Sequence, residues 1–154
     1  MPNKKPQPDQ NVYSQVTALC TSANLRKTSR AVTQLYDDFL QPSGLLGTQF
    51  RLLGAVASNG PIPLAPLAEE LTLDATTLAR NLKPLEREGL VEVSVGEDRR
   101  TRMVKITEKG QAALFKAFPL WQEAQTWIID HIGEDRWRMM LADWNELASL
   151  VRNR

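Results

Sequence analysis

The sequence is poor in the residues on which most disulfide, metal and acid–base chemistry depends. Its 154 residues include a single cysteine, Cys20, and a single histidine, His131, which lie near opposite ends of the chain. One chain therefore has neither a disulfide framework nor a zinc site built from cysteine and histidine alone. The sequence also has no glycine loop that would cradle phosphate and no plausible Ser–His–Asp set. We therefore expect no enzymatic activity, no cofactor and no metal.

Long apolar runs and a large excess of charge of one sign are also missing. No apolar segment approaches the length that spans a bilayer, and residues 1–11 contain three prolines with no apolar stretch behind Lys4 and Lys5. We therefore expect a disordered N-terminal lead-in over 1–11, no membrane partner and a cytoplasmic location. The net charge is +1, so any surface that binds a polyanion must be local.

The segments on either side of the centre have the apolar periodicity of helices. The pattern predicts one long helix from about 12 to 40, a core helix capped by Thr48, and a helix that starts after Thr107 and breaks at Gly133. The last predicted helix repeats apolar residues at spacings of four and three, the pattern of a helix interface: Trp137, Leu141, Trp144, Ala148 and Val151.

The centre of the chain mixes short helices with strands. A helix over 66–71 is followed by a second helix over 75–88, with Asp74 as its N-cap. Two stretches that alternate apolar and polar residues, 90–95 and 103–106, predict a β-hairpin with a charged tip. A short helix, a turn, a capped second helix and a basic hairpin together predict a winged helix-turn-helix.

The second helix of such a unit enters the major groove of double-stranded DNA with its first residues facing base edges. Hydroxyl groups suit bases or phosphates, arginine suits guanine and asparagine suits adenine. The hairpin tip has three arginines within four residues, which suits a narrow minor groove, and a neighbouring aspartate could fix one guanidinium. The predicted DNA-binding residues are Thr76, Thr77, Arg80, Asn81, Lys83, Asp98, Arg99, Arg100 and Arg102.

The run from Leu67 to Gly110 combines these motifs in one order. An Asp-x-Arg signature lies in the wing at Asp98 and Arg100, and Ile-Thr-Glu-Lys-Gly joins the second strand to the next helix. In these features the sequence resembles the MarR family of bacterial transcriptional regulators. The resemblance implies a repressor that binds a pseudo-palindromic operator and is released by a small-molecule effector or by thiol oxidation.

The resemblance also implies how the chain is divided. The expected fold is mainly α with a small β-hairpin wing, in which 48–107 form the winged helix-turn-helix. Residues 12–47 and 108–154 would interlace with a second copy as a helical dimerisation domain. A twofold homodimer would place two recognition helices about 34 Å apart, roughly one turn of DNA.

Two sets of residues keep alternative interpretations open. Aromatic residues at helical spacing either belong to the core or line a ligand pocket between the two domains: Tyr36, Phe39, Phe118 and Trp121. Cys20 is either a small buried residue or a redox sensor, since a branch of the family senses peroxides through a cysteine in its first helix. The spacing here places Ser22 nearer that position. The second tyrosine of that branch is also missing, and Gly47 lies near the place where it is expected.

A different alternative is a winged-helix module that binds protein without DNA readout. The three closely spaced arginines of the hairpin tip argue against this alternative, because a protein-binding wing has no need of them.

Overall fold

The computed structural model describes residues 10–154 of the chain. Its contacts divide into two compact units, with the boundary between Leu35 and Tyr36. Most of the predicted disordered lead-in over 1–11 lies outside the described residues, whereas residues 10 and 11 are helical.

The first unit has two helices where one was predicted. Helix α1 (Gln10–Leu19) ends before Cys20, and helix α2 (Thr21–Leu40) begins after it. The side-chain amide of Asn24 donates hydrogen bonds to the carbonyl oxygens of Ala18 and Cys20, each at 3.0 Å. The prediction of a single long helix was wrong: the chain breaks at Cys20, and the Asn24 side chain bonds to the Ala18 carbonyl, which a continuous helix would use.

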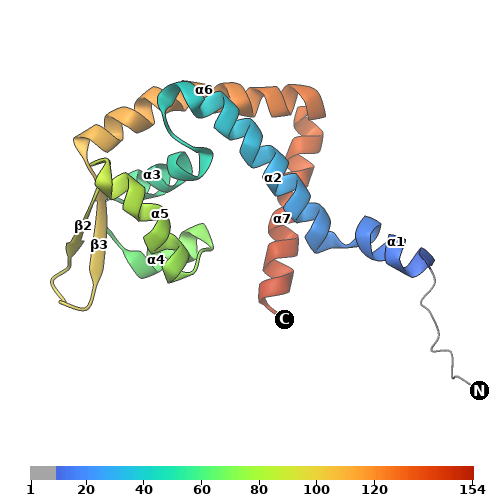
Figure 1. The fold of residues 1–154 in the computed structure, drawn as a ribbon, viewed down its shortest axis with the longest axis horizontal. Coiled ribbons are helices and arrows are strands. Elements are labelled where there is room, and N and C mark those ends of the chain that lie inside the picture. Colours follow the sequence, from blue (N-terminus) through green and yellow to red (C-terminus); the bar gives the residue numbers. More distant parts are fainter. Residues whose placement is uncertain (1–9) are drawn as a thin grey trace, which may run out of the picture. The chain divides into compact units, whose positions relative to one another are not determined.

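The second unit contains the end of α2 and all of the elements that follow it. The prediction of a mainly α fold with a small β-hairpin wing is confirmed (Figure 1). The elements follow in the order η1 (Gln41–Ser43), α3 (Gly47–Asn59), β1 (Ile62–Pro63), α4 (Leu64–Leu71), α5 (Ala75–Arg87), β2 (Val91–Val95), β3 (Arg102–Ile106), α6 (Glu108–Ile132) and α7 (Glu134–Arg152).

The three strands form one antiparallel sheet in the order β1-β3-β2. Val95 pairs with Arg102 at the turn end of the β2–β3 hairpin, and Ile62 of β1 pairs with Val104. Strand β1 was not predicted, since two residues are too short to show a period. Helix α4 begins at Leu64, directly after β1 and two residues before its predicted start.

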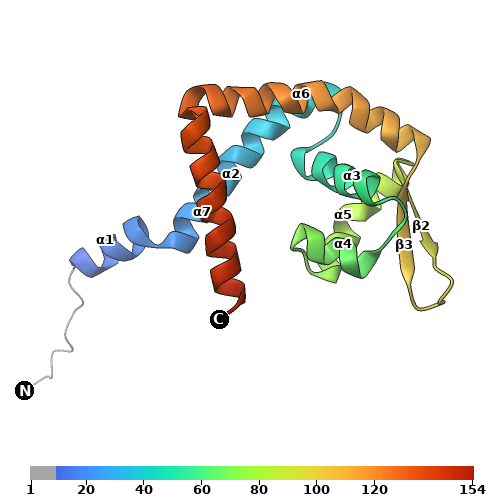
Figure 2. The ribbon, with the colours of Figure 1, turned by 180° about the vertical axis from the view of Figure 1, so that it is seen from behind.

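The core of this unit lies between its helices and one face of the sheet. Helix α3 contacts α6 and β3, α4 packs on α5, and α5 packs on β2. Side chains from all of these layers are completely or almost completely buried: Leu53, Val56, Leu67, Leu78, Leu85, Val91, Val104 and Ala117. Figure 2 shows the hairpin extending beyond the helices, so its tip is free to contact another molecule.

Helix α3 begins one residue before the predicted cap, so the prediction for Thr48 was wrong. Its first residue is Gly47, whose N–H donates to the carboxylate of Asp37 at 2.7 Å. The N–H of Leu46 donates to the side-chain oxygen of Gln49 at 2.9 Å. A side chain ten residues earlier thus serves as a partner for the helix start, which sequence spacing did not indicate.

Candidate nucleic-acid interface

Asp74 holds the first turn of α5. One carboxylate oxygen accepts the backbone N–H of Thr77 at 2.8 Å, and the other accepts the Thr77 hydroxyl at 2.7 Å. These bonds, the hydroxyl bond first, hold the pKa of Asp74 below its usual value. The Thr77 hydroxyl is therefore engaged in capping the helix. Of the two threonines in this turn, Thr76 is the exposed one, whereas Thr77 is half-buried.

The rest of α5 separates a buried face from an exposed one. Leu78, Leu82 and Leu85 are buried in the core. Arg80 and Lys83 are exposed, and Asn81 is half-buried. The helix continues through Pro84 to Arg87, so the exposed face is continuous. Predicted base-contacting residues and a predicted phosphate contact thus share one side of α5.

The wing tip is a turn closed by hydrogen bonds. The N–H of Gly96 donates to the carbonyl of Thr101 at 2.7 Å, and the N–H of Thr101 donates to the carbonyl of Asp98 at 2.8 Å. The Asp98 carboxylate accepts the backbone N–H of Arg100 at 3.1 Å. Asp98 was predicted to fix a guanidinium, but its bond is to the backbone of Arg100. Its role is to shape the turn that presents the arginines.

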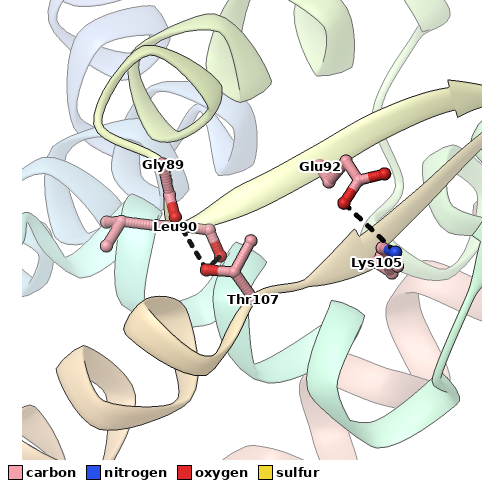
Figure 3. Close-up of polar contacts among 5 residues, drawn as sticks. All are labelled: Gly89, Leu90, Glu92, Lys105 and Thr107. Atoms are coloured by element: carbon pink, nitrogen blue, oxygen red, sulfur yellow. Dashed lines mark hydrogen bonds and ion pairs between the residues drawn. The ribbon is translucent and has the colours of Figure 1, made fainter.

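The lysines near the wing are engaged within the chain. Lys105 pairs with Glu92 across β2 and β3 at 3.1 Å (Figure 3), and Lys109 donates to the carbonyl of Glu88 at 2.6 Å. The three arginines of the tip, by contrast, are exposed and have no ion pair within residues 10–154: Arg99, Arg100 and Arg102. Among the basic residues of the wing, the ones available to a partner are therefore these arginines.

Thr107 joins the end of α5 to the start of α6. Its hydroxyl donates toward the carbonyls of Gly89 and Leu90, at 2.7 and 3.1 Å (Figure 3), and accepts the N–H of Gly110 at 3.0 Å. The same side chain thus caps α6 and bonds to the segment between α5 and β2. This bonding fixes the base of the wing relative to the second helix.

The wing and the start of α5 line one hollow of about 330 Å³. Arg100, Thr101 and Arg102 form the wing side, and Ala75 forms the α5 side. Residues 63–65, at the start of α4, complete the lining, and sequence reasoning missed them. The available signal was Pro63 and Pro66, since proline favours the first turn of a helix. Predicted wing residues thus lie beside the first residue of the predicted recognition helix.

A second hollow, of about 290 Å³, lies further along α5. Arg80, Asn81 and Pro84 line it together with residues of the loop before α3 and its first turns: Leu46, Thr48, Gln49 and Leu52. The start of α3 was not predicted to approach the recognition helix. The exposed face of α5 therefore has the wing near its N-terminus and α3 beside its middle.

The four aromatic residues predicted to be core or ligand-binding are not equivalent. Trp121 stacks on Phe118, with ring centroids 5.6 Å apart. Trp121 and Tyr36 are each partly buried against the core. The Tyr36 hydroxyl donates to the side-chain oxygen of Gln125 at 2.5 Å, and burial raises the pKa of Tyr36. Phe39 is half-buried. A ligand-binding role for these residues stays a prediction.

Cys20 lies at the break between α1 and α2. It is half-buried within one chain, and its burial in a dimer-forming helix stays a prediction. It lines a hollow of about 540 Å³ within the first unit, together with Ser22, Ala23, Arg26, Lys27 and Arg30. A redox role for Cys20 also stays a prediction.

Residues 10–154 contain no group of three or more His, Cys, Asp or Glu side chains arranged to hold a metal ion. Over the same residues, no helix has both the length and the apolar character needed to cross a bilayer.

The short helix α4, the capped helix α5 and the sheet with its basic hairpin define a winged helix-turn-helix protein. A MarR family model matches residues 43–101, which include these elements up to the wing tip. An HTH-type transcriptional regulator of Bacillus cereus is 30% identical over 108 residues, 70% of this chain and 72% of that protein. The chain belongs to the MarR family of winged-helix transcriptional regulators.

Solved structures agree with this assignment. The Mycobacterium tuberculosis transcriptional regulator MosR, in complex with DNA, is 37% identical with a TM-score of 0.76, covering 86% of this chain and 98% of that one. Escherichia coli MarR with operator DNA shares the fold, with a TM-score of 0.78 at 21% identity over 86% of this chain and 96% of that one. Several other curated relatives, including Bacillus subtilis YwoH, are matched over 57 to 64% of their own length.

Proposed function

We propose that this chain is a sequence-specific DNA-binding transcriptional regulator. In this proposal it is a repressor that binds a pseudo-palindromic operator in double-stranded DNA as a homodimer, and a small-molecule effector relieves repression. Residues 48–107 read the DNA, whereas 12–47 and 108–154 form the dimer. The regulators to which the chain is similar support a role outside enzyme catalysis.

The observation that carries DNA binding is the hollow that Ala75 shares with Arg100 and Arg102. A recognition helix inserted in the major groove would place the neighbouring wing over the adjacent minor groove, where arginine side chains are favoured. Thr76, Arg80 and Asn81 would then face bases, and Lys83 would contact phosphate. The MosR and MarR structures named above hold DNA, which supports the same mode here.

Unburied apolar side chains support the homodimer. Helix α7 has no buried residue although it carries two tryptophans and several leucines, and every side chain of α1 from residue 11 to 19 is exposed. Exposed apolar surface of this extent is typical of a protein interface. A second copy that covers these helices would pair the two winged units about a twofold axis.

Relief of repression follows from linkage between the effector and DNA. A small molecule that binds better to a dimer with wrongly spaced recognition helices lowers DNA affinity by the ratio of its two affinities. The aromatic residues Tyr36, Phe39, Phe118 and Trp121 are the proposed ligand contacts.

Selection of DNA sites from a random duplex library, at about physiological salt, tests the proposal. We expect an inverted repeat with half-sites one helical turn apart, which would also supply the probe for effector screens. If a folded, dimeric protein enriches no sequence, the DNA-reading function is contradicted and the protein-interaction module becomes the better hypothesis.

A second candidate is a repressor that senses oxidants through Cys20. The observation that favours it is the position of Cys20 at a helix break, half-buried and lining an open hollow. A peroxide should then release the wild-type protein from the selected operator but leave Cys20→Ser bound. Equal release of both proteins would contradict a sensing role for Cys20.

A further inference from the structure

The first half of α2 carries positive charge without any neighbouring acid. Arg26, Lys27 and Arg30 are exposed, and residues 10–36 contain no aspartate or glutamate. Spacings of three and four place them on one face of the helix, where they line the hollow beside Cys20. None of the three has an ion pair within the described residues 10–154. We call Arg26, Lys27 and Arg30 the basic face.

Helix α7 carries the opposite pattern. Asp143 and Glu146 are exposed, and residues 139–151 contain no lysine or arginine. Met139 and Leu150, with 65% and 67% of their surface exposed, lie four residues before Asp143 and four residues after Glu146. These four residues repeat at spacings of four, three and four and thus form one ridge, which we call the acidic ridge. Its two carboxylates also lack an ion pair in the part of the chain that the structure describes.

We infer that the acidic ridge of a second copy docks on the basic face, so that Asp143 and Glu146 of one subunit pair with Arg26, Lys27 and Arg30 of the other. This inference rests on the homodimer of the proposed function and specifies which surfaces make it. The two surfaces are opposite in charge, and the long stems of the arginines and the lysine can cover Met139 and Leu150 while their charged ends reach the carboxylates. The hollow beside the basic face provides room for the ridge.

Twofold symmetry makes this contact occur twice in each dimer. Reversing the charges on one surface therefore converts two attractive contacts into two repulsive ones. We expect Arg26→Glu/Arg30→Glu, and separately Asp143→Lys/Glu146→Lys, each to raise the dimer dissociation constant at least tenfold at low salt. The effect should shrink as salt rises, because exposed charges are screened. Arg87→Glu also replaces a positive charge by a negative one, but on α5, outside the segments proposed to form the dimer, and should leave the dissociation constant unchanged.

The decisive experiment mixes the two reversed proteins, one of them tagged. In the mixed dimer both contacts join opposite charges again, so the heterodimer should form with nearly wild-type affinity although neither homodimer does. Sedimentation measures the dissociation constants, and co-expression with copurification gives the same answer if either variant folds poorly alone. Wild-type behaviour of the separate variants, or no recovery on mixing, overturns the docking. A monomeric wild type would instead contradict the homodimer itself.

Discussion

At the scale of single residues, Arg100 is positioned by its backbone and leaves its side chain free. Its N–H is bonded to Asp98, and the neighbouring N–H of Thr101 bonds to the Asp98 carbonyl. The guanidinium is exposed beside Ala75 at the start of α5. A residue held in this way can lose its side chain without any change in the turn.

Arg100→Ala is therefore expected to weaken operator binding more than tenfold with no change in folding. The lost guanidinium would remove the minor-groove contact of each wing, whereas alanine keeps the N–H that Asp98 holds. Fluorescence anisotropy with the selected operator at matched salt measures the affinity, and circular dichroism checks the fold. Lys116→Ala on α6 removes an equal charge as a control, and unchanged affinity of the Arg100 variant would contradict the wing assignment.

Asp74 couples the stability of α5 to pH. Because the bonds from Thr77 lower its pKa in the folded chain, its carboxylate stabilises the fold above the unfolded pKa, about 4. That contribution is lost as the pH falls through the lower folded value. We expect Asp74→Ala to melt at a lower temperature than wild type at pH 7, and the two melting temperatures to converge below about pH 4. A difference of the same size at low pH as at pH 7 would show that the charge of Asp74 does not stabilise the helix.

At the scale of elements, the start of α6 packs so closely on Leu90, the residue before β2, that one glycine is required. A Cβ added to Gly110 would lie 2.0 Å from the carbonyl oxygen of Leu90 and 2.8 Å from a side-chain carbon of Ile106. Gly54, in the interior of α3, is the opposite case, because an added Cβ would meet nothing within 4 Å. The two positions separate packing from helix propensity.

Gly110→Ala should lower the free energy of unfolding by about 3 kcal/mol, since backbone atoms must shift to admit the methyl group. Gly54→Ala should raise it by about 0.5 to 1 kcal/mol, because alanine is the better helix former and no contact opposes it. Denaturant titration of both variants measures the changes. Equal effects at the two positions would mean that α6 can move away from Leu90 at no cost.

The elements that were predicted correctly are those whose signals are local. Asp74 and Thr107 are short polar side chains that bond to N–H groups three residues ahead, a signal contained in the sequence itself. The break at Cys20 and the start of α3 at Gly47 depend on the side chains of Asn24 and Asp37, which also stabilise other conformations. Strand β1 exists only because it pairs with β3, about forty residues later in the chain.

The candidate site shows the same division. The residue types of α5 and the wing could be predicted from motif order, but their roles required coordinates. Thr77 and Asp98 were predicted to be DNA contacts, and each makes a bond that shapes the backbone. The start of α4 borders Arg100, and α3 borders Arg80. Both contacts arise from packing between elements that are distant in the sequence.

At the scale of the whole molecule, net charge supplies little attraction for DNA. The chain carries a formal charge of +1, so affinity must come from local contacts that each displace counterions. A homodimer presents every such contact twice. The dependence of binding on salt therefore reports both which residues contact phosphate and how many copies of the chain bind.

Lys83 gives the clearest test, because it is exposed on α5 beyond the residues proposed to read bases. The slope of log K against log salt falls by about 0.9 for each phosphate contact that is lost. Lys83→Ala should therefore reduce the slope by about 1.8 for a dimer, with affinity falling equally on specific and random duplexes. Anisotropy titrations over a series of salt concentrations measure the slope, and Lys116→Ala should leave it unchanged. A reduction near 0.9 would mean that one subunit alone contacts DNA, and no reduction would remove Lys83 from the interface.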